Sequence, residues 1–244
     1  MSTDSPFRSR GPIADVDALA QLRAGDVEIV GRMPWSSNHT YLVDIDGDEI
    51  IQAVYKPAQG ERPLWDFPAG LYVREVASYE LSHQLGWDLV PPTVLRDGPL
   101  GQGSLQLFVT ADYEQHYFTL LEQPEHHHAL QRLCVLDVIA NSTDRKGGHC
   151  LCDADNHVWA IDNGLTFHQE FKLRTVIWDW AGERLPPDIV EDVISLVDDG
   201  LNDDLASHLD AFERDAALSR ARAVIQGGCF PTDPSGRRYP WPLV

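Results

Sequence analysis

Cysteine is scarce in this sequence, with four residues in 244. Cys134, Cys150, Cys152 and Cys229 are too few and too irregularly spaced for a disulfide framework or a paired CxxC zinc site. We therefore expect reduced thiols. Cys150 and Cys152 follow His149 in a pattern that faintly resembles a metal cluster, but alternate positions on an apolar strand explain both cysteines better.

Positive charge is also scarce, because 19 Lys and Arg residues stand against 38 Asp and Glu residues, for a net charge of -19. Such a chain repels a phosphate backbone and an anionic bilayer, so we expect no nucleic-acid partner. The first ten residues lack the apolar core of a signal peptide, and no apolar run approaches membrane-spanning length. The expected location is the cytoplasm, without stable membrane insertion.

The chain has no internal repeat, low-complexity tract or internal Pro/Gly/Ser-rich linker. Its hydrophobic fraction of 43%, with seven Trp, seven Tyr and eight Phe, is that of an ordinary globular protein. A chain of 244 residues suffices for one domain or for two small lobes that share a cleft.

The first half is β-rich and predicts an antiparallel sheet interrupted by one helix. Apolar residues at helical spacing predict that helix over 73–86, where Gly86 can end it. A turn is expected at 46–48, and another at Asp97-Gly98. The expected extended segments are 27–33, 40–46, 49–56, 90–95 and 104–109. Together they predict a small α+β lobe.

The second half is mainly helical. A helix is expected over about 125–140, followed by a polar loop at 141–148 and a short hairpin that ends on Asp162-Asn163-Gly164. The run His126-His127-His128 could bind metal, but consecutive helical residues point in different directions, so a solvated helix start is favoured. Further apolar stripes predict later helices and comprise Ile189, Val190, Val193, Ile194 and Val197, then Leu205, Leu209 and Phe212, then Leu218, Val224 and Ile225.

Four residues stand in the order that a kinase site requires. Such a site needs a strand lysine for the nucleotide phosphates, a helix glutamate to orient it, a loop aspartate for the nucleophile's proton, and a further aspartate for metal. The matching residues are Lys56, Glu75, Asp144 and Asp162. Each alone is more often a surface or turn residue. Their order and spacing favour a site that binds ATP with a divalent metal, Mg²⁺ or Mn²⁺.

Other positions extend this site and also depart from the kinase pattern. Ser36, Ser37 and Asn38 occupy the loop where kinases use glycines, and would offer amides and polar side chains to phosphate. Lys146, two residues after Asp144, is placed to neutralise the transferred phosphoryl group. His149 stands where protein kinases have a metal-binding asparagine. Either a metal ligand or a structural histidine at a strand start fits that position.

Two motifs carry a resemblance to a known family. The stretches 141–145 (NSTDR) and 160–167 (AIDNGLTF) resemble the phosphatidylinositol 3- and 4-kinase superfamily, most closely type II phosphatidylinositol 4-kinases, and a small actinobacterial kinase-like family is more similar still. The likeness covers about residues 27 to 190 and includes Ser78-Tyr79, Val90-Pro-Pro-Thr93, Trp178-Asp-Trp180 and Leu185-Pro186. It implies that Lys56 and Glu75 form an ion pair, that Asp144 is catalytic and that Asp162 binds metal.

The pattern and the resemblance together predict an α+β, two-lobed, protein-kinase-like fold. The expected parts are an N-terminal extension (1–19), an N-lobe (20–107), a C-lobe (108–230) and a C-terminal tail (231–244). ATP would lie between the lobes beneath a hinge at 106–109, in which Gln106 and Phe108 contact adenine. Arg145 is expected to anchor its loop rather than to touch substrate.

The sequence does not identify the molecule that accepts the phosphoryl group. A protein, a lipid or a small molecule would each fit, although membrane docking has no visible basis because palmitoylation-type cysteine clusters and basic amphipathic helices are missing. His149 and the serine loop also fit a pseudokinase that serves as a nucleotide-binding scaffold. Nucleotidyl transfer is a third reading, because ATP bound in the reverse orientation would present its α-phosphate.

Overall fold

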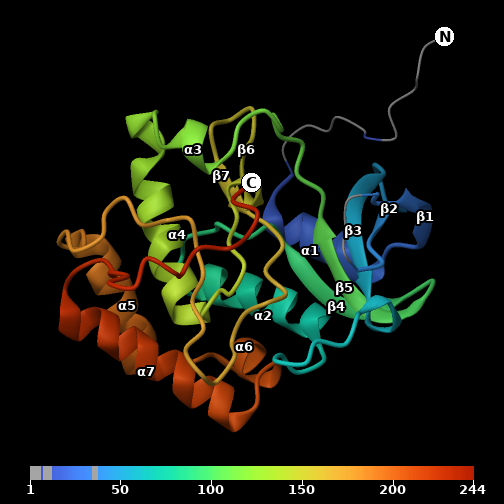
Figure 1. Ribbon diagram of the computed structural model, residues 1–244. Coiled ribbons are helices and arrows are strands. Elements are labelled where there is room, and N and C mark those ends of the chain that lie inside the picture. Colours follow the sequence, from blue (N-terminus) through green and yellow to red (C-terminus); the bar gives the residue numbers. More distant parts are fainter. Residues whose placement is uncertain (1–6, 8–12, 35–37) are drawn as a thin grey trace.

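A five-stranded antiparallel sheet forms one side of the molecule, as the sequence predicts (Figure 1). The computed structural model describes residue 7 and residues 13–34 and 38–244. The strand order is β1-β2-β3-β5-β4, and every neighbouring pair is antiparallel. The strands are β1 (Val27–Arg32), β2 (Tyr41–Ile45), β3 (Ile51–Pro57), β4 (Thr93–Gly98) and β5 (Gly101–Leu107).

The turn between β4 and β5 lies later than the sequence predicts. Gly98 pairs with Gly101, so Asp97-Gly98 belongs to β4 and β5 begins three residues before the expected position 104. The two glycines at 101 and 103 weaken the strand signal of this segment. Glycine is required at position 103, because a Cβ there would lie 2.5 Å from the Lys56 carbonyl oxygen.

Helix α1 (Asp15–Ala24) was not predicted and packs against the sheet. It buries Ala18 and Leu22 in a core with Val43, Ile45 and Leu105. Only these two residues of α1 are buried, so its apolar stripe is too narrow for a helical pattern to stand out. The helix runs through positions 19 and 20, where the sequence placed the start of the N-lobe.

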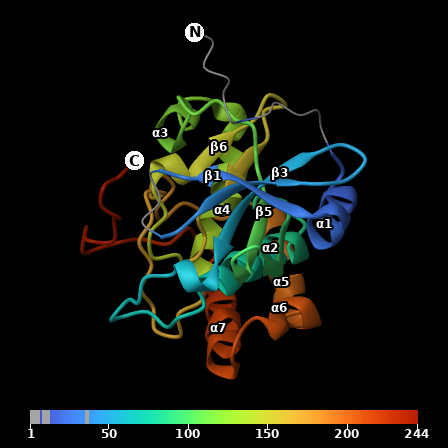
Figure 2. The same ribbon diagram turned by 90° about the vertical axis from the view of Figure 1, so that its right-hand side faces the viewer.

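Helix α2 (Leu71–Gln84) confirms the helix expected over 73–86 and joins the two parts of the molecule. It contacts β4 and β5 on one side and the helical part on the other. Figure 2, in which the sheet side faces the viewer, shows α5, α6 and α7 below the sheet. Because α2 lies between both parts, ten of its 14 residues are buried, including the charged Arg74 and Glu75.

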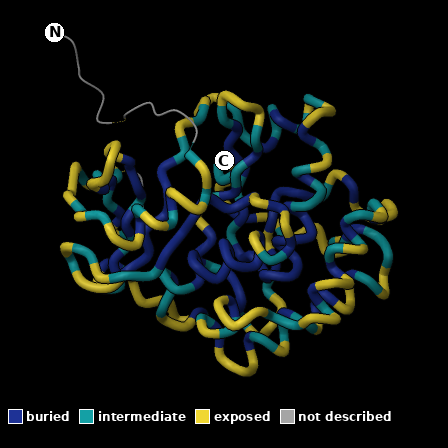
Figure 3. The backbone as a smooth tube through the Cα atoms, turned by 180° about the vertical axis from the view of Figure 1, so that it is seen from behind, coloured by how far each residue is buried: buried dark blue, intermediate teal, exposed yellow. Residues whose placement is uncertain are grey.

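The helical part surrounds the buried helix α4 (His127–Ala140), which confirms the helix expected over 125–140. Figure 3 shows its interior as a continuous buried region. The hairpin after α4 is also confirmed. The remaining elements are α3 (Tyr117–Leu120), β6 (Cys150–Cys152), β7 (Val158–Ala160), α5 (Pro187–Asp199), α6 (Asp203–Ser207), α7 (Ala211–Gly227), and three short 3₁₀ helices at Ala58–Gly60, Pro124–His126 and Gly147–His149.

The buried face of α7 differs from the predicted stripe. Phe212 is 70% exposed, whereas the charged residues Glu213 and Arg220 are buried. Glu213 accepts a hydrogen bond from Arg74, and Arg220 donates to the Ile139 carbonyl oxygen. These contacts let charged residues occupy a face that an apolar stripe would otherwise mark, although one terminal nitrogen of Arg220 has no partner among the described residues.

Several alternatives from the sequence are decided by this fold. All four cysteines are free thiols. His126 is buried at the turn before α4, His127 contacts the Leu121 carbonyl oxygen, and His128 pairs with Asp188, so the histidine run opens a helix. Within residues 13–34 and 38–244, no helix is long and apolar enough to cross a membrane.

Candidate functional site

A cavity of about 630 Å³ lies between the sheet and the helical part. It brings together every predicted site residue that the structure describes. Those lining residues are Asn38, Lys56, Glu75, Gln106, Phe108, Asp144, Lys146, His149 and Asp162. Ser36 and Ser37 lie outside the described residues. Residues separated by more than 120 positions in the chain therefore face one space.

Lys56 lies at the centre of this site. Its Nζ donates to Glu75 Oε1 and, at 2.8 Å, to Asp162 Oδ1. Burial disfavours the charged ammonium, but the two carboxylates outweigh it and raise the pKa of Lys56 above its ordinary value. The Lys56 ammonium in turn lowers the pKa of Asp162. Lys56 and Asp162 are therefore both charged at neutral pH, as a site for polyphosphate and metal requires.

The Asp162 turn approaches α2 closely. Asp162 has a left-handed backbone with φ of 58°, which is uncommon for a residue with a side chain. The Asn163 amide donates to Glu75 Oε2 at 2.9 Å, and a Cβ on Gly164 would lie 3.1 Å from Glu75 Oε1. Glycine is thus the residue that lets this turn meet Glu75. Strained backbone of this kind is concentrated at functional sites.

Asp144 lies on the loop that follows α4, and Lys146 Nζ is 3.2 Å from its Oδ2. Asn141 ends α4 in a left-handed conformation, φ 57°, which asparagine tolerates well. Burial raises the pKa of Asp144, although Lys146 partly opposes this effect. A carboxylate with a raised pKa is better suited to accept a proton than an ordinary aspartate.

Arg145 anchors this loop, as expected, and is almost fully buried. Its Nε donates to Asp137 Oδ1 at 3.1 Å, and its terminal nitrogens donate to the Ile161 carbonyl oxygen at 2.8 Å and to Asn163 Oδ1 at 2.5 Å. Thr175 Oγ1 also donates to Asp137. One guanidinium therefore holds the Asp144 loop and the Asp162 turn in register.

His149 Nε2 lies 3.6 Å from Asp162 Oδ2. Burial lowers the pKa of His149 to about 4, so its imidazole is neutral at physiological pH. Its Nδ1 accepts from the Lys146 amide at 3.4 Å, which puts the ring proton on Nε2, facing Asp162. A cation bound at Nε2 would therefore require the other tautomer, with Asp162 as the oxygen ligand beside it. Within residues 13–34 and 38–244, no three His, Cys, Asp or Glu side chains gather to hold a metal. A cation here would take its remaining ligands from phosphate and water, as Mg²⁺ commonly does.

The hinge supplies backbone and an apolar wall. Gln106 Nε2 donates to Thr93 Oγ1 at 3.0 Å, and Gln106 also lines the cavity, so its expected contact with adenine stays a prediction. The Phe108 amide donates to the Gln52 carbonyl oxygen. The apolar residues that line the cavity include Met33, Val54, Leu107, Phe108, Leu151 and Ile161.

The loop over 61–70 was not predicted as part of the site, and it contributes Glu61, Arg62 and Leu64 to the cavity. Glu61 accepts hydrogen bonds from the Gly70 and Tyr72 amides and so orders the start of α2. A capping residue nine positions before the N-terminal residue that it caps cannot be recognised from the spacing of residues in the sequence. Leu151 and Ile161 could have been found, because they lie on the hairpin that carries Asp162.

Comparison with known proteins identifies a relative. Protein Rv2133c of Mycobacterium tuberculosis is 38% identical over 264 aligned positions, which cover 93% of this chain and 95% of the relative. The chain belongs to the family of Rv2133c. No protein-family model matches the chain.

Solved structures place this family in a wider fold group. The Golgi casein kinase with Mn/ADP bound has a TM-score of 0.60 at 15% identity, over 94% of this chain and 80% of its own. Hydra Fam20 with sugar has a TM-score of 0.55 at 12% identity, over 87% of each chain. The Helicobacter pylori proinflammatory kinase CtkA has a TM-score of 0.50 at 8% identity, over 86% of this chain and 94% of its own. The fold is therefore protein-kinase-like.

Proposed function

We propose that this protein is an ATP-dependent phosphotransferase that transfers the γ-phosphate of ATP to a hydroxyl group of an acceptor. The observation that carries the proposal is the convergence of Lys56, Glu75, Asp144 and Asp162 on one cavity in a kinase-like fold. In this proposal the N-lobe (20–107) and the C-lobe (108–230) hold ATP between them, and residues 231–244 form a tail. We also propose that the chain is related to the phosphatidylinositol 3- and 4-kinases, as the resemblance of its motifs implies.

Each residue has a role that follows from its position. Lys56, fixed by Glu75, binds the nucleotide phosphates, and Lys146 neutralises charge on the transferred group. Asp144 orients the acceptor hydroxyl and takes its proton as the acceptor oxygen bonds to the γ-phosphorus. The bond from the γ-phosphorus to the β,γ-bridging oxygen breaks, and ADP leaves with that electron pair. Asp162, with His149 beside it, would hold a divalent cation that neutralises the phosphates when bound.

Incubation with ATP labelled at either phosphate tests the reaction class. Label transferred from γ-labelled ATP alone supports phosphoryl transfer. Label from α-labelled ATP would mean nucleotidyl transfer, and label from neither, with Asp144→Asn as the matched blank, would favour a nucleotide-binding scaffold.

A further inference from the structure

Basic residues are unevenly distributed in this acidic chain. Its only three lysines are Lys56, Lys146 and Lys172. The first two line the cavity, and Lys172 Nζ donates to the Asp66 carbonyl oxygen in the loop beside it. The stretches 171–178 (FKLRTVIW) and 236–244 (GRRYPWPLV) each contain two cations and no carboxylate. In a chain with twice as many acidic as basic residues, these two stretches form a local basic surface.

Backbone pairing places Arg174 next to Asp144. Arg145 and Thr175 form a parallel bridge, in which the Arg145 amide donates to the Arg174 carbonyl oxygen at 3.1 Å. The side chains of Arg145 and Thr175 both turn inward, since both bind Asp137. The bridge brings the backbones of Asp144 and Arg174 close together; the Asp144 side chain lines the cavity, whereas Arg174 is outside that lining.

Arg174 is exposed, and no described residue hydrogen-bonds or pairs with its guanidinium. This exposed cation, one residue from the bridge to the Asp144 loop, has no partner among the described residues that would account for it. An exposed guanidinium presents a fork of donors that matches phosphate or carboxylate oxygens.

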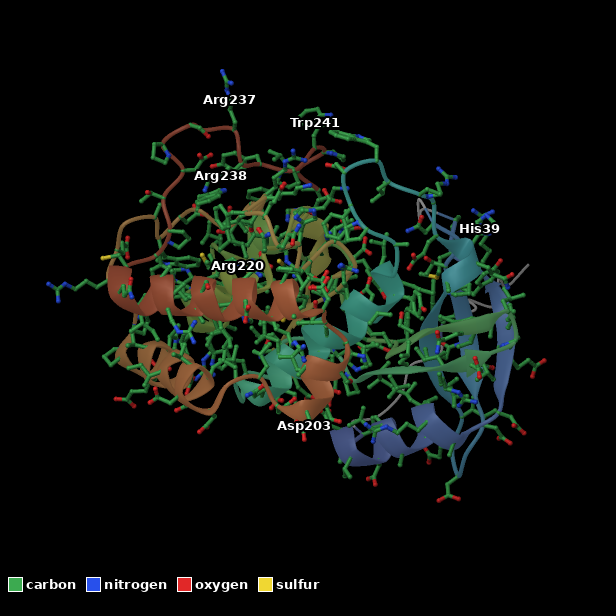
Figure 4. The ribbon with its side chains drawn as sticks, turned by 90° about the horizontal axis from the view of Figure 1, so that it is seen from below. His39, Asp203, Arg220, Arg237, Arg238 and Trp241 are labelled. Carbon is green, nitrogen blue, oxygen red and sulfur yellow. The ribbon has the colours of Figure 1, made fainter. Side chains whose placement is uncertain are left out.

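Arg238 comes to the same segment from the tail. Its carbonyl oxygen accepts from the Thr175 amide at 3.1 Å, and its guanidinium lies over the Phe171 ring at 4.9 Å from the centroid. Asp233 is its ion-pair partner, with Oδ1 3.9 Å from Nε, and also accepts from the Arg238 backbone amide at 2.8 Å. Figure 4 shows Arg237 and Arg238 together on the tail, with Arg237 pointing into solvent. The tail also reaches the catalytic loop, because the Gly147 amide donates to the Leu243 carbonyl oxygen at 2.6 Å.

We propose that the acceptor is a soluble molecule with an anionic group, phosphate or carboxylate, near its reacting hydroxyl, and that Arg174 and Arg238 bind this group beside Asp144. This inference rests on the proposed phosphotransferase function and adds the chemical class of its acceptor. A net charge of -19 repels an anionic bilayer as a whole, whereas a small solute meets only the local basic surface. That difference favours a soluble acceptor over a lipid headgroup.

The test uses the full chain saturated with a non-hydrolysable ATP analogue and Mg²⁺, so that the nucleotide site is filled. Three matched probes are titrated by NMR: glycerol, glycerate and glycerol 3-phosphate. The variants are Arg174→Gln and Arg238→Gln, with Arg222→Gln as the control for loss of one exposed charge on α7. Co-sedimentation with vesicles of phosphatidylcholine and phosphatidylserine tests the lipid source.

We expect one or both charged probes to bind while glycerol does not. Each of Arg174→Gln and Arg238→Gln should weaken that binding about tenfold, as expected for loss of one charge-assisted hydrogen bond, and Arg222→Gln should not. Equal binding in all variants, or no binding of either charged probe to the nucleotide-loaded protein, overturns the inference but leaves the proposed function standing. Vesicle binding that Arg174→Gln abolishes would assign the surface to lipid and also overturn it. If the ATP analogue itself does not bind, the proposed function fails first.

Discussion

Replacing Arg145 with lysine tests whether one buried side chain holds the site together. Lysine keeps the positive charge but has a single ammonium in place of a planar fork. It can remain near Asp137, but it cannot also reach the Ile161 carbonyl oxygen and Asn163 Oδ1, which Arg145 binds at 2.8 and 2.5 Å. Two acceptors that flank Asp162 then lose their charged donor.

The cost follows from those two contacts. Hydrogen bonds to charged groups contribute about 1.5–3 kcal/mol each, so the loss of two in Arg145→Lys should lower the free energy of unfolding by about 3–6 kcal/mol. A similar range, about 3–5 kcal/mol, is typical when a buried ion pair is broken. Total stabilities of about 5–15 kcal/mol make this a large fraction. Because Ile161 and Asn163 flank Asp162, metal-dependent ATP binding should weaken as well.

Urea denaturation and ATP calorimetry measure both effects. Thr175→Val provides a second variant that keeps Arg145 but removes one bond to the Asp137 carboxylate and the acceptor of the Ile177 amide, for an expected loss of about 2–4 kcal/mol. Arg222→Lys, on the exposed side of α7, is the control and should match wild type. If Arg145→Lys stays within about 1 kcal/mol of wild type and binds ATP equally well, the anchoring argument is wrong, since losses of that size are ordinary for any substitution.

Three further predictions address the proposed chemistry. Asp144→Asn should reduce ATP turnover about 100-fold or more while ATP affinity in calorimetry stays near wild type; equal turnover would remove Asp144 from the mechanism. Asp162→Ala should weaken ATP binding in the presence of metal, whereas Asp155→Ala, an exposed carboxylate in the hairpin turn, should not; unchanged affinity in Asp162→Ala would exclude it as a metal ligand. If His149 is a ligand, wild type should prefer Mn²⁺ to Mg²⁺ in ATP-binding titrations, and His149→Asn should shift the preference towards Mg²⁺; identical preferences would give His149 a structural role.

Local patterns were enough to predict the elements that carry the site. Lys56 ends an alternating strand, α2 repeats its apolar residues at helical spacing, and the turn at Asp162-Asn163-Gly164 follows a short hairpin, so each residue type and its element could be predicted together. The order of these residues matches that of a kinase site, and this match predicts that they converge on one site.

Contacts between side chains far apart in the chain could not be predicted from the sequence. The side chain of Gln106, the first residue of the expected hinge, donates to Thr93 on the neighbouring strand, a contact that no local pattern predicts. Glu213 and Arg220 are buried on α7, where Arg74 donates to Glu213 and the Ile139 carbonyl oxygen accepts from Arg220. Partners 139 and 81 positions away leave no trace in a local pattern. Helix α1 was missed for a different reason, because only two of its residues are buried.

Contacts with the helical part of the molecule hold helix α2 in place beside the site. Arg74 on α2 binds Glu213 and the Thr166 carbonyl oxygen, and the adjacent Glu75 accepts from the Asn163 amide, so the helix is held by the helical part of the molecule. The Lys56–Glu75 pair is therefore built by the fold and needs no movement of α2 to form. Asp162 uses Oδ1 for Lys56 while Oδ2 faces His149, so one oxygen remains for a cation without breaking the lysine contact. Neither Arg174 nor Arg238 lines the cavity, so in our proposal they select the acceptor from outside that lining.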